Sequence, residues 1–249
     1  MDPNSSRSER YRSSSIGWSI GRVVVMLYSL AKPMMAAVFY WPLFGLRIRT
    51  PRLELRLPTD PDLFELVAVA RAGIHEPGQM PFIEPWTETP SPEFERGFLQ
   101  YHWSTRANWR PEDWRLELGV WADGHAAGAQ AISADAYPER GTISTGSWLG
   151  RPFHGRGYGK EMRTAVLAFA FDYLGAQWVT SAAFVDNAAS IAISRSLGYA
   201  ETSIEEHESD GETREAINFL MTPDLWHSRE RPPIEVEGFD DCRGFFGIG

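Results

Sequence analysis

The chain has 249 residues, of which 43% are hydrophobic and 23% are charged, and this composition suits one globular domain of about 170 to 200 residues with extensions. Its formal net charge of −9 argues against nucleic-acid binding through a broad basic surface and suits a cationic partner such as an amine. Cys242 is the single cysteine, so no internal disulfide can form, and no group of Cys and His has the spacing of a zinc site. We therefore expect a cytoplasmic protein with no metal ion and no nucleic-acid partner.

Residues 1–46 are predicted to form an N-terminal extension in two parts. Residues 1–15 are rich in Ser and Arg and have a disordered composition, whereas residues 16–46 are strongly apolar. The longest charge-free part of the apolar segment, 33–46, is shorter than the roughly 20 residues of a membrane-spanning helix. Two readings remain open. The segment is either an interfacial or partner-binding helix, with membrane contact as the less favoured form, or upstream sequence absent from a mature protein that starts near Met34.

Hydrophobic alternation and capping residues predict the first elements after this extension. Residues 53–57 alternate apolar and charged side chains and are predicted to form a strand. Thr59, followed by proline and acidic residues, predicts a helix to about residue 72. Repeated prolines in 73–92 predict a loop, and a second helix is expected from there to about residue 109. His102 in that helix is expected to be a structural histidine.

The second half is predicted to be richer in strands, and it contains one strongly periodic helix. The expected strands are 115–121, 126–133, 141–149, 178–184, 200–208 and 215–221. The first two pair across Asp123-Gly124 as a hairpin, and the last two form a second hairpin. The tail, 223–249, contains prolines and apolar residues and is expected to wrap the domain or to pack on a second subunit.

A glycine-rich loop, residues 154–160, separates the strand 141–149 from the periodic helix. Its glycines allow the backbone to turn sharply and bring several N–H groups close to an anion, and the helix N-terminus adds a positive dipole end. The spacing does not match a nucleoside-triphosphate loop, because Glu161 stands where a hydroxyl is needed. It does not match a dinucleotide fingerprint either, because Lys160 takes the place of the third glycine.

Two motifs together resemble the GNAT family of N-acetyltransferases, most of all its RimJ/RimL-type branch. The loop resembles the family's Gln/Arg-x-x-Gly-x-Gly/Ala motif with Gly157 and Gly159 in register, although His154 replaces the first residue. A second segment, 186–199, resembles the family's Asn-x-x-Ser/Ala motif followed by a short helix that ends in Leu-Gly-Tyr. For residues 47–222 the resemblance implies a mixed α/β GNAT fold. Its central, mostly antiparallel sheet would have six to seven strands and about four flanking helices, and it would open between the fourth and fifth strands.

The resemblance also implies a binding site for an acyl-coenzyme A. The pantetheine arm would add along the fourth strand, and the pyrophosphate would lie in the glycine loop. The implied coenzyme contacts are Trp148, Leu149, His154, Gly155, Arg156, Gly157, Tyr158, Gly159, Lys160, Asn187 and Ser190. In the family the loop after the first helix shapes the acceptor pocket, so Phe82, Glu84 and Trp86 are candidate substrate contacts, with anchoring of the loop to the core as the alternative for Phe82 and Trp86.

Candidate catalytic residues follow from the requirements of acyl transfer to an amine. Many family members place a tyrosine seven residues after the motif asparagine, a position that Ser194 occupies here. RimL-type members use the motif serine, which corresponds to Ser190, so we expect Ser190 to donate to the thiolate with Ser194 behind it. The candidate bases are Glu206 and His207 on the penultimate strand, with Glu117 as a further candidate. An α-amine also reacts without a dedicated base, because its pKa is only about 7.7 to 8.0.

The sequence therefore predicts an acyl-CoA-dependent N-acyltransferase that moves an acyl group, expected to be acetyl, directly to an amine. Acetyl-CoA, or another acyl-CoA such as succinyl-CoA, is the expected co-substrate. The acceptor is a protein N-terminus, a lysine or a small-molecule amine, and the protein is a monomer or a homodimer. The alternative is a module that binds acyl-CoA or a protein partner without catalysis.

Overall fold

The structure is a computed structural model that describes residues 36–209 and 211–248. The compact unit described below comprises residues 41–249. The predicted disorder of 1–15 and most of the apolar segment 16–46 lie outside the described residues. Within the part of the chain that the structure describes, no helix is both long and apolar enough to cross a membrane.

The compact unit is built on a sheet of nine strands in the order β7-β8-β6-β5-β4-β3-β2-β1-β9. Neighbouring strands are antiparallel except for β5 and β6, which are parallel. The strands are β1 (Arg47–Arg49), β2 (Leu53–Arg56), β3 (Trp114–Ala122), β4 (His125–Ala134), β5 (Thr142–Leu149), β6 (Trp178–Phe184), β7 (Ala200–Ser209), β8 (Glu212–Met221) and β9 (Glu235–Glu237). The mixed α/β fold with a mostly antiparallel sheet is therefore confirmed.

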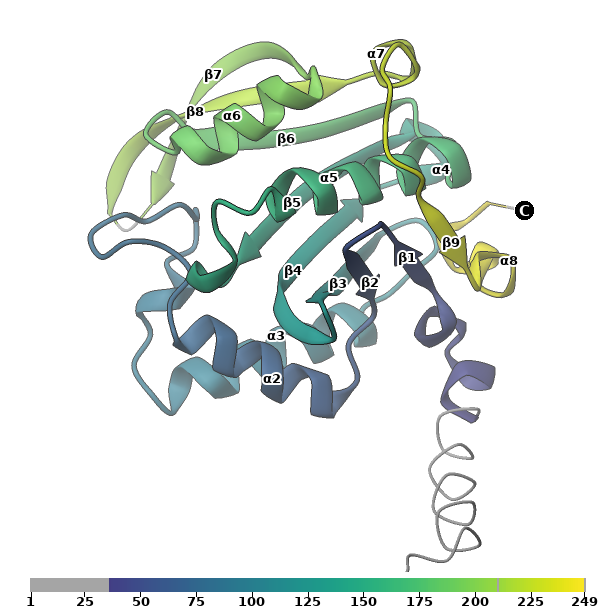
Figure 1. The fold of residues 1–249 in the computed structure, drawn as a ribbon, viewed down its shortest axis with the longest axis horizontal. Helices are drawn as coiled ribbons and strands as arrows, with labels where there is room; N and C mark the ends of the chain where they lie inside the picture. Colours follow the sequence, from purple (N-terminus) through teal and green to yellow (C-terminus); the bar gives the residue numbers. More distant parts are fainter. Residues whose placement is uncertain (1–35, 210, 249) are drawn as a thin grey trace, which may run out of the picture. The chain divides into compact units, whose positions relative to one another are not determined.

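Strands β5 and β6 separate along their length, as the fold prediction requires. Only Thr142–Ser144 of β5 pair with β6, at Trp178–Thr180, whereas β5 remains paired with β4 as far as Leu149. The second half of β5 thus has an edge that faces a gap in the sheet. Figure 1 shows β5 and β6 diverging toward the loop that precedes α5.

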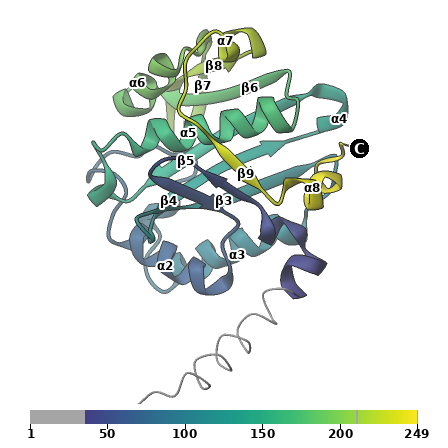
Figure 2. The ribbon, with the colours of Figure 1, turned by 45° about the vertical axis from the view of Figure 1, so that its right-hand side comes forward.

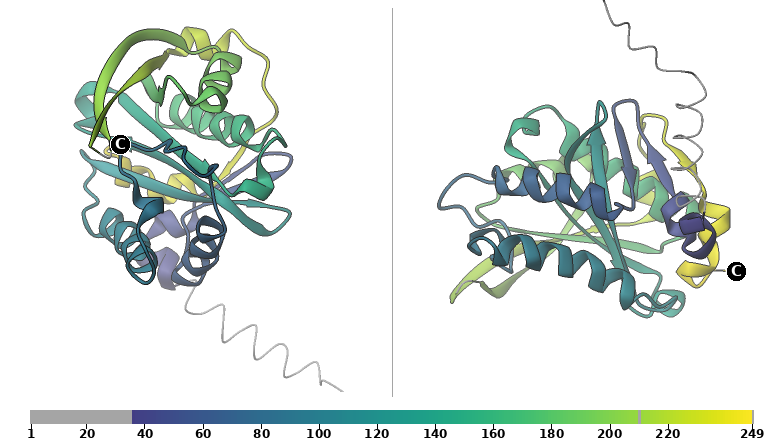
Figure 3. Two further views of the ribbon diagram at one scale, coloured as in Figure 1. Left: turned by 90° about the vertical axis from the view of Figure 1, so that its left-hand side faces the viewer. Right: turned by 90° about the horizontal axis from the view of Figure 1, so that it is seen from below.

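Helices cover both faces of the sheet (Figure 3). The α2 helix (Asp60–Arg71) begins at a capping box formed by Thr59 and Asp62. With α3 (Glu93–Ala107), it buries one apolar cluster against Trp121 and Ala126. The α5 helix (Tyr158–Ala168), a π-helical turn (Phe169–Tyr173) and α6 (Ala188–Leu197) cover the other face over a larger core. Shorter helical segments are Pro42–Gly45, Trp86–Glu88, Arg151–Phe153 and α4 (Tyr137–Arg140).

The sheet has two more strands than the upper limit of the prediction, and these are the two shortest, β1 and β9, at one edge. The β9 strand comes from the tail and pairs with β1 (Figure 2). The tail also forms α7 (Pro223–His227), α8 (Phe239–Cys242) and a turn over Arg243–Phe246. Phe246 is fully buried, and the Trp109 indole donates to the Phe245 carbonyl at 2.8 Å. The tail therefore wraps the domain, which was one of its two expected arrangements.

Candidate active site

The glycine loop adopts a backbone conformation that suits glycine. Gly155 has a φ of +71° and Gly157 a φ of +81°, and both values lie in the left-handed region that side chains disfavour. Gly157 is the N-cap residue of α5, so the unpaired N–H groups of the first helical turn point toward the loop. An anion with several oxygen atoms fits this arrangement, because the N–H groups and the helix dipole act on it together.

Gly159 brings the two helices on this face of the sheet together. A Cβ atom at Gly159 would lie 2.8 Å from Cδ1 of Ile193 in α6, which is too close for any side chain without a shift. The loop that precedes α5 is thereby held close to α6, whose N-terminus carries the second motif. The sequence pattern places a glycine here, and the structure supplies the physical reason.

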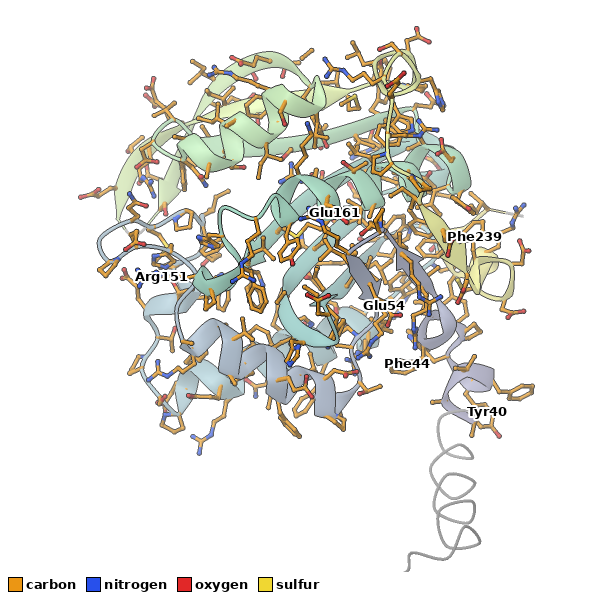
Figure 4. All side chains as sticks on the ribbon, in the orientation of Figure 1. Tyr40, Phe44, Glu54, Arg151, Glu161 and Phe239 are labelled. Atoms are coloured by element: carbon orange, nitrogen blue, oxygen red, sulfur yellow. The ribbon has the colours of Figure 1, made fainter. Side chains whose placement is uncertain are left out.

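Charged side chains around the loop leave it positive. The Arg52 guanidinium donates to the Glu161 carboxylate at 2.7 Å and to the main-chain carbonyl of Arg156 at 2.9 Å. Figure 4 labels Glu161 near the start of α5. Because Arg52 neutralises Glu161, the exposed side chains of Arg156 and Lys160 remain available to a phosphate.

His154 points its imidazole at the end of β5. Its Nε2 lies 2.9 Å from the carbonyl oxygen of Leu149, so Nε2 carries the proton and donates to that oxygen. The neutral ring therefore has Nδ1 left only as an acceptor. A direct bond from the neutral imidazole to a phosphate oxygen would need the ring to leave Leu149.

The two edges of β5 use different main-chain groups. The Gly150 N–H donates to the Ala127 carbonyl of β4 at 2.8 Å, whereas the Gly141 carbonyl accepts from the Trp178 N–H of β6 at 3.1 Å. Main-chain groups alternate between the two sides along a strand. Even-numbered residues of β5 therefore face β4, and odd-numbered residues face β6 or, further along, the gap.

This alternation determines which main-chain groups of β5 face the gap. Trp148 directs its N–H and carbonyl toward β4, so its main chain does not face the gap. Ser147 and Leu149 are the residues of the open edge, and the Leu149 carbonyl already accepts from His154. The sequence prediction included Leu149 but not Ser147, because the sequence alone does not determine which residues of the strand face the gap.

The side chain of Trp148 belongs to an aromatic cluster on the opposite face from α5. The ring of Trp86 lies 6.0 Å from that of Trp148 and 5.5 Å from that of Phe82, between centroids. Trp86 also stacks on Phe94 of α3, at 5.8 Å. Phe82 and Trp86 thus anchor the loop 73–92 to the core, which was the alternative reading of both residues. Glu84 is exposed.

The second motif forms the start of α6. The side-chain oxygen of Asn187 accepts from the main-chain N–H of Ser190 at 3.1 Å and caps the helix. Ser190 is partly exposed, whereas Ser194 is fully buried and its hydroxyl has no hydrogen-bond partner among the described residues. Asn187 therefore has a structural role that does not depend on a coenzyme.

Of the two candidate bases on β7, only one shares a face with the aromatic loop. His207 lies opposite Arg214, and Glu206 lies opposite Glu215. The Ser209 hydroxyl, on the same side of β7 as His207, donates to the carbonyl of Ile83 in the loop at 2.9 Å. Glu206 faces the other way and is exposed. His207 is partly buried, and its Nε2 has no partner among the residues described.

Glu117 lies on the α3 side of the sheet in a cluster with Tyr101 and Arg115. It is 6% exposed and accepts a short hydrogen bond from the Tyr101 hydroxyl, which in turn accepts from Arg115 at 2.9 Å. Burial raises the pKa of Glu117, and the bond from Tyr101 and the charge of Arg115 offset part of that effect. A carboxylate with a raised pKa is a stronger base than an ordinary glutamate.

Strand register aligns Glu117 with the gap in the sheet. Glu117 pairs with Ala131 of β4, and Ala131 pairs with Gly146 of β5. These three residues form one row across the strands, so their side chains lie on one face. A Cβ atom at Gly146 would meet nothing within 4 Å. The space above Gly146, beside the gap, is therefore open. Between this space and Glu117 lies only the methyl side chain of Ala131.

Comparisons with known proteins agree with this geometry. Residues 52–200 match the acetyltransferase (GNAT) domain family, and that range is more than half of the chain. The chain belongs to the GNAT family. A Vibrio cholerae structure classed as a ribosomal-protein-serine acetyltransferase is 26% identical, covers 71% of this chain and 97% of its own, and has a TM-score of 0.57. Mycobacterium smegmatis RimJ with a CoA-disulfide is 17% identical, covers 75% of this chain and 93% of its own, and has a TM-score of 0.60.

Another solved structure is RimL, a ribosomal α-N-protein acetyltransferase, in complex with coenzyme A. It is 16% identical, covers 71% of this chain and 97% of its own, and has a TM-score of 0.57. The family match makes this protein an acyl-CoA-dependent N-acetyltransferase, and the likeness to RimJ and RimL shows a shared fold. Within residues 36–209 and 211–248, no group of three or more His, Cys, Asp and Glu side chains is arranged to hold a metal ion.

Some residues of the site have no signal in the sequence. Arg52 binds the loop from a position more than a hundred residues earlier, and Tyr101 reaches Glu117 from α3. Each contact depends on how separate elements pack. The helical spacing of α3 does indicate that Tyr101 and His102 cannot point the same way, but it does not say which of them meets β3.

Proposed function

We propose that this GNAT enzyme transfers acetyl from acetyl-CoA to the α-amino group of a polypeptide N-terminus, with Glu117 as the general base. The observation that carries the proposal is the row Glu117–Ala131–Gly146, which ends in open space at the gap between β5 and β6. An amine above Gly146 would have the buried carboxylate of Glu117 on one side and, on the other, the open edge of β5, where the coenzyme is proposed to bind.

The coenzyme would bind on the α5 side of the gap. Main-chain N–H groups of the loop and the side chains of Arg156 and Lys160 would hold the pyrophosphate, and the glycine geometry described above supports this. The pantetheine arm would lie along the open edge of β5, at Ser147 and Leu149. Acetyl-CoA supplies an activated carbonyl carbon and a thiolate leaving group.

Ser147 is suited to polarise that carbonyl. Its main-chain N–H faces the gap and can donate to the carbonyl oxygen as negative charge develops there. A donor fixed in a strand needs no rearrangement at the moment of reaction, so its bond strengthens as the charge grows. Ser190, at the start of α6, remains the proposed hydrogen-bond donor to the departing sulfur.

Distances along the strands favour Glu117 over His207 as the base. Adjacent strands are roughly 4.8 Å apart, so the Glu117 backbone is about 10 Å from that of Gly146, which a glutamate side chain and one water span. Continuing the β5–β6 register places Ala182 of β6 level with Gly146. Ala182 and Ser203 of β7 both pair with the same β8 residue, so Ser203 lies at that level too. His207 lies four residues further along β7. Four residues correspond to about 13 Å along a strand. Glu206 faces the other side.

An α-amine is the acceptor class that this site serves best. Its pKa of about 7.7 to 8.0 leaves a large neutral fraction at neutral pH, whereas a lysine amine near 10.4 is almost wholly charged. A buried carboxylate with a raised pKa can take the proton of the former more easily than that of the latter. RimL, which shares the fold, is described as an α-N-protein acetyltransferase.

Peptide acetylation with matched variants tests the proposal. Coenzyme A release is measured with a peptide that has a free α-amine and no lysine, and with an N-terminally blocked peptide that contains lysine. We expect turnover only of the first, and we expect Glu117→Gln to reduce kcat by about 10²- to 10⁴-fold, the usual contribution of general base catalysis. Glu206→Gln, which changes an exposed carboxylate on the other side of the sheet, should leave kcat within about twofold.

Two results would contradict the proposal. Preferential turnover of the blocked lysine peptide would exclude an α-amine as the acceptor. Full activity of Glu117→Gln at saturating peptide, together with loss of activity in His207→Gln, would assign the base to β7 instead of β3.

A further inference from the structure

Arg163, on the inner side of α5, is a buried cation with no counter-ion in the described part of the chain. It is 4% exposed. Its guanidinium donates to two neutral hydroxyls, to Ser181 at 3.0 Å and to Ser147 at 3.4 Å. No carboxylate among residues 36–209 and 211–248 forms a salt bridge with it, and its Nε has no hydrogen-bond partner there.

The Tyr199 phenol, an ionisable group close to Arg163, does not supply a negative charge. The phenol of Tyr199 lies near Arg163 and Thr145, and burial raises its pKa while the nearby guanidinium lowers it by less. Tyr199 therefore remains a neutral phenol. Burial of a guanidinium without an anion costs free energy. The binding of an anionic ligand group at Arg163 during function would explain why this cation is buried.

Arg163 bridges the two strands at the point where they separate. Ser147 belongs to the part of β5 beyond its last pairing with β6, and Ser181 is the first β6 residue after Thr180, the end of that pairing. The two hydroxyls that Arg163 binds thus stand on opposite sides of the gap. At the closed end of the gap the Thr145 hydroxyl donates to the Thr180 carbonyl at 3.1 Å.

This closure fixes where the coenzyme arm ends. An arm that follows the open edge of β5 meets main-chain groups of Leu149 and then of Ser147, and the gap closes at Thr145. The thioester end of the arm therefore comes to the level of Ser147, where the guanidinium lies. Two atoms gain negative charge at this end. The carbonyl oxygen does so in passing and has the Ser147 N–H as its proposed donor, whereas the sulfur leaves as an anion.

Resting on the proposed function, we propose that Arg163 is a catalytic residue that holds the sulfur of coenzyme A as a thiolate. The amine nitrogen bonds to the carbonyl carbon, and the carbon–sulfur bond breaks with its electron pair going to sulfur. The surplus proton of the nitrogen passes to the general base and then to solvent. The guanidinium pairs with the thiolate, so the leaving group takes no proton from a serine. Ser190 keeps its hydrogen bond to the sulfur, and Ser194, at the position where many family members carry a tyrosine, is not needed as an acid.

Ionisation of bound coenzyme A tests this directly, without any acceptor. The full chain is saturated with free coenzyme A, and the ultraviolet absorbance of the thiolate is followed between about pH 6 and pH 10, with coenzyme A alone as the reference. An alkyl thiol such as cysteine ionises near pH 8.5. We expect the bound thiol to ionise at least one pH unit lower, Arg163→Met to return it to within a few tenths of the free value, and Arg163→Lys to keep part of the shift.

The outcomes separate this inference from the function on which it rests. Bound coenzyme A that ionises at the same pH as free coenzyme A, in the unmodified protein, overturns the role of Arg163 even if the variants fail to fold. Tighter binding of succinyl-CoA than of acetyl-CoA, lost in Arg163→Met, would place an acyl carboxylate on the guanidinium and would also overturn it. Failure of the folded protein to bind any coenzyme A would refute the coenzyme site itself.

Discussion

His102 should make this protein lose stability as the pH falls below neutrality. The side chain is 3% exposed in α3, with its ring 4.7 Å from that of Phe98. Burial, with a smaller contribution from the charge of Arg106, lowers the pKa of His102 to about 3. The folded protein therefore keeps the ring neutral, while the unfolded chain binds a proton below about pH 6.5.

The sign of the effect follows from which state binds more protons. Between about pH 6.5 and pH 3 the unfolded state holds the extra proton, so the free energy of unfolding falls as the pH falls. Each pH unit in that window removes about 1.4 kcal/mol, and the whole window removes at most on the order of 5 kcal/mol. Above about pH 6.5 both states are neutral at this site, and the contribution is flat.

Urea unfolding at a series of pH values measures this effect. His102→Phe keeps a ring in the same space and has no proton to bind, so its free energy of unfolding should fall less steeply than that of the unmodified protein between about pH 6 and pH 4. His125→Gln is the matched control, because His125 is exposed at the start of β4. Parallel curves for His102→Phe and the unmodified protein would refute the reasoning.

Three further predictions concern the site. Gly157→Glu places a negative side chain in the loop at a φ of +81° and should abolish coenzyme A binding in calorimetric titration; retained affinity would exclude the loop as the anion site. Gly146→Val fills open space above β5 and should raise KM for the peptide about tenfold or more with coenzyme A affinity within about twofold; an unchanged KM would place the acceptor elsewhere. Glu117→Gln should raise the free energy of unfolding at pH 7, because the folded pKa of Glu117 lies above its usual 4.5 and stability is lost as the pH rises through it. The gain should vanish below about pH 4.5, and a gain that persists in acid would contradict the burial argument.

The sequence predicts the elements that have a strong local signal. The capping box at Thr59 marks the start of α2, and Asp123-Gly124 marks the turn between β3 and β4. The spacing of Gly157 and Gly159 predicts the loop, because the positive φ of Gly157 favours glycine and the close approach of Gly159 to Ile193 of α6 leaves little room for a side chain. In these places one short stretch of chain contains most of the physical cause.

The sequence does not predict the edge strands or the faces of the strands. The β1 and β9 strands have three residues each, too few for alternation to stand out. The β1 strand pairs with both β2 and β9, and β9 pairs with β1. The exposed edge strand β7 carries charge on both of its faces, so its pattern cannot separate His207 from Glu206. Its register with β8 makes that separation.

The register of the strands divides the site into two halves that mutation can address separately. Ser147 and Arg163 meet on the α5 side of the gap, where the coenzyme is proposed to bind, whereas Gly146 and Glu117 share the α3 side. Ser147 and Gly146 are adjacent in the chain, and alternation along the strand sends their side chains to opposite faces. A substitution at Gly146 can therefore obstruct the amine without reaching the guanidinium, and a substitution at Arg163 can change the sulfur without filling the acceptor space. If both kinds of substitution damaged coenzyme binding equally, the two halves would not be separate, and the assignment of acceptor and coenzyme to opposite faces of β5 would fail.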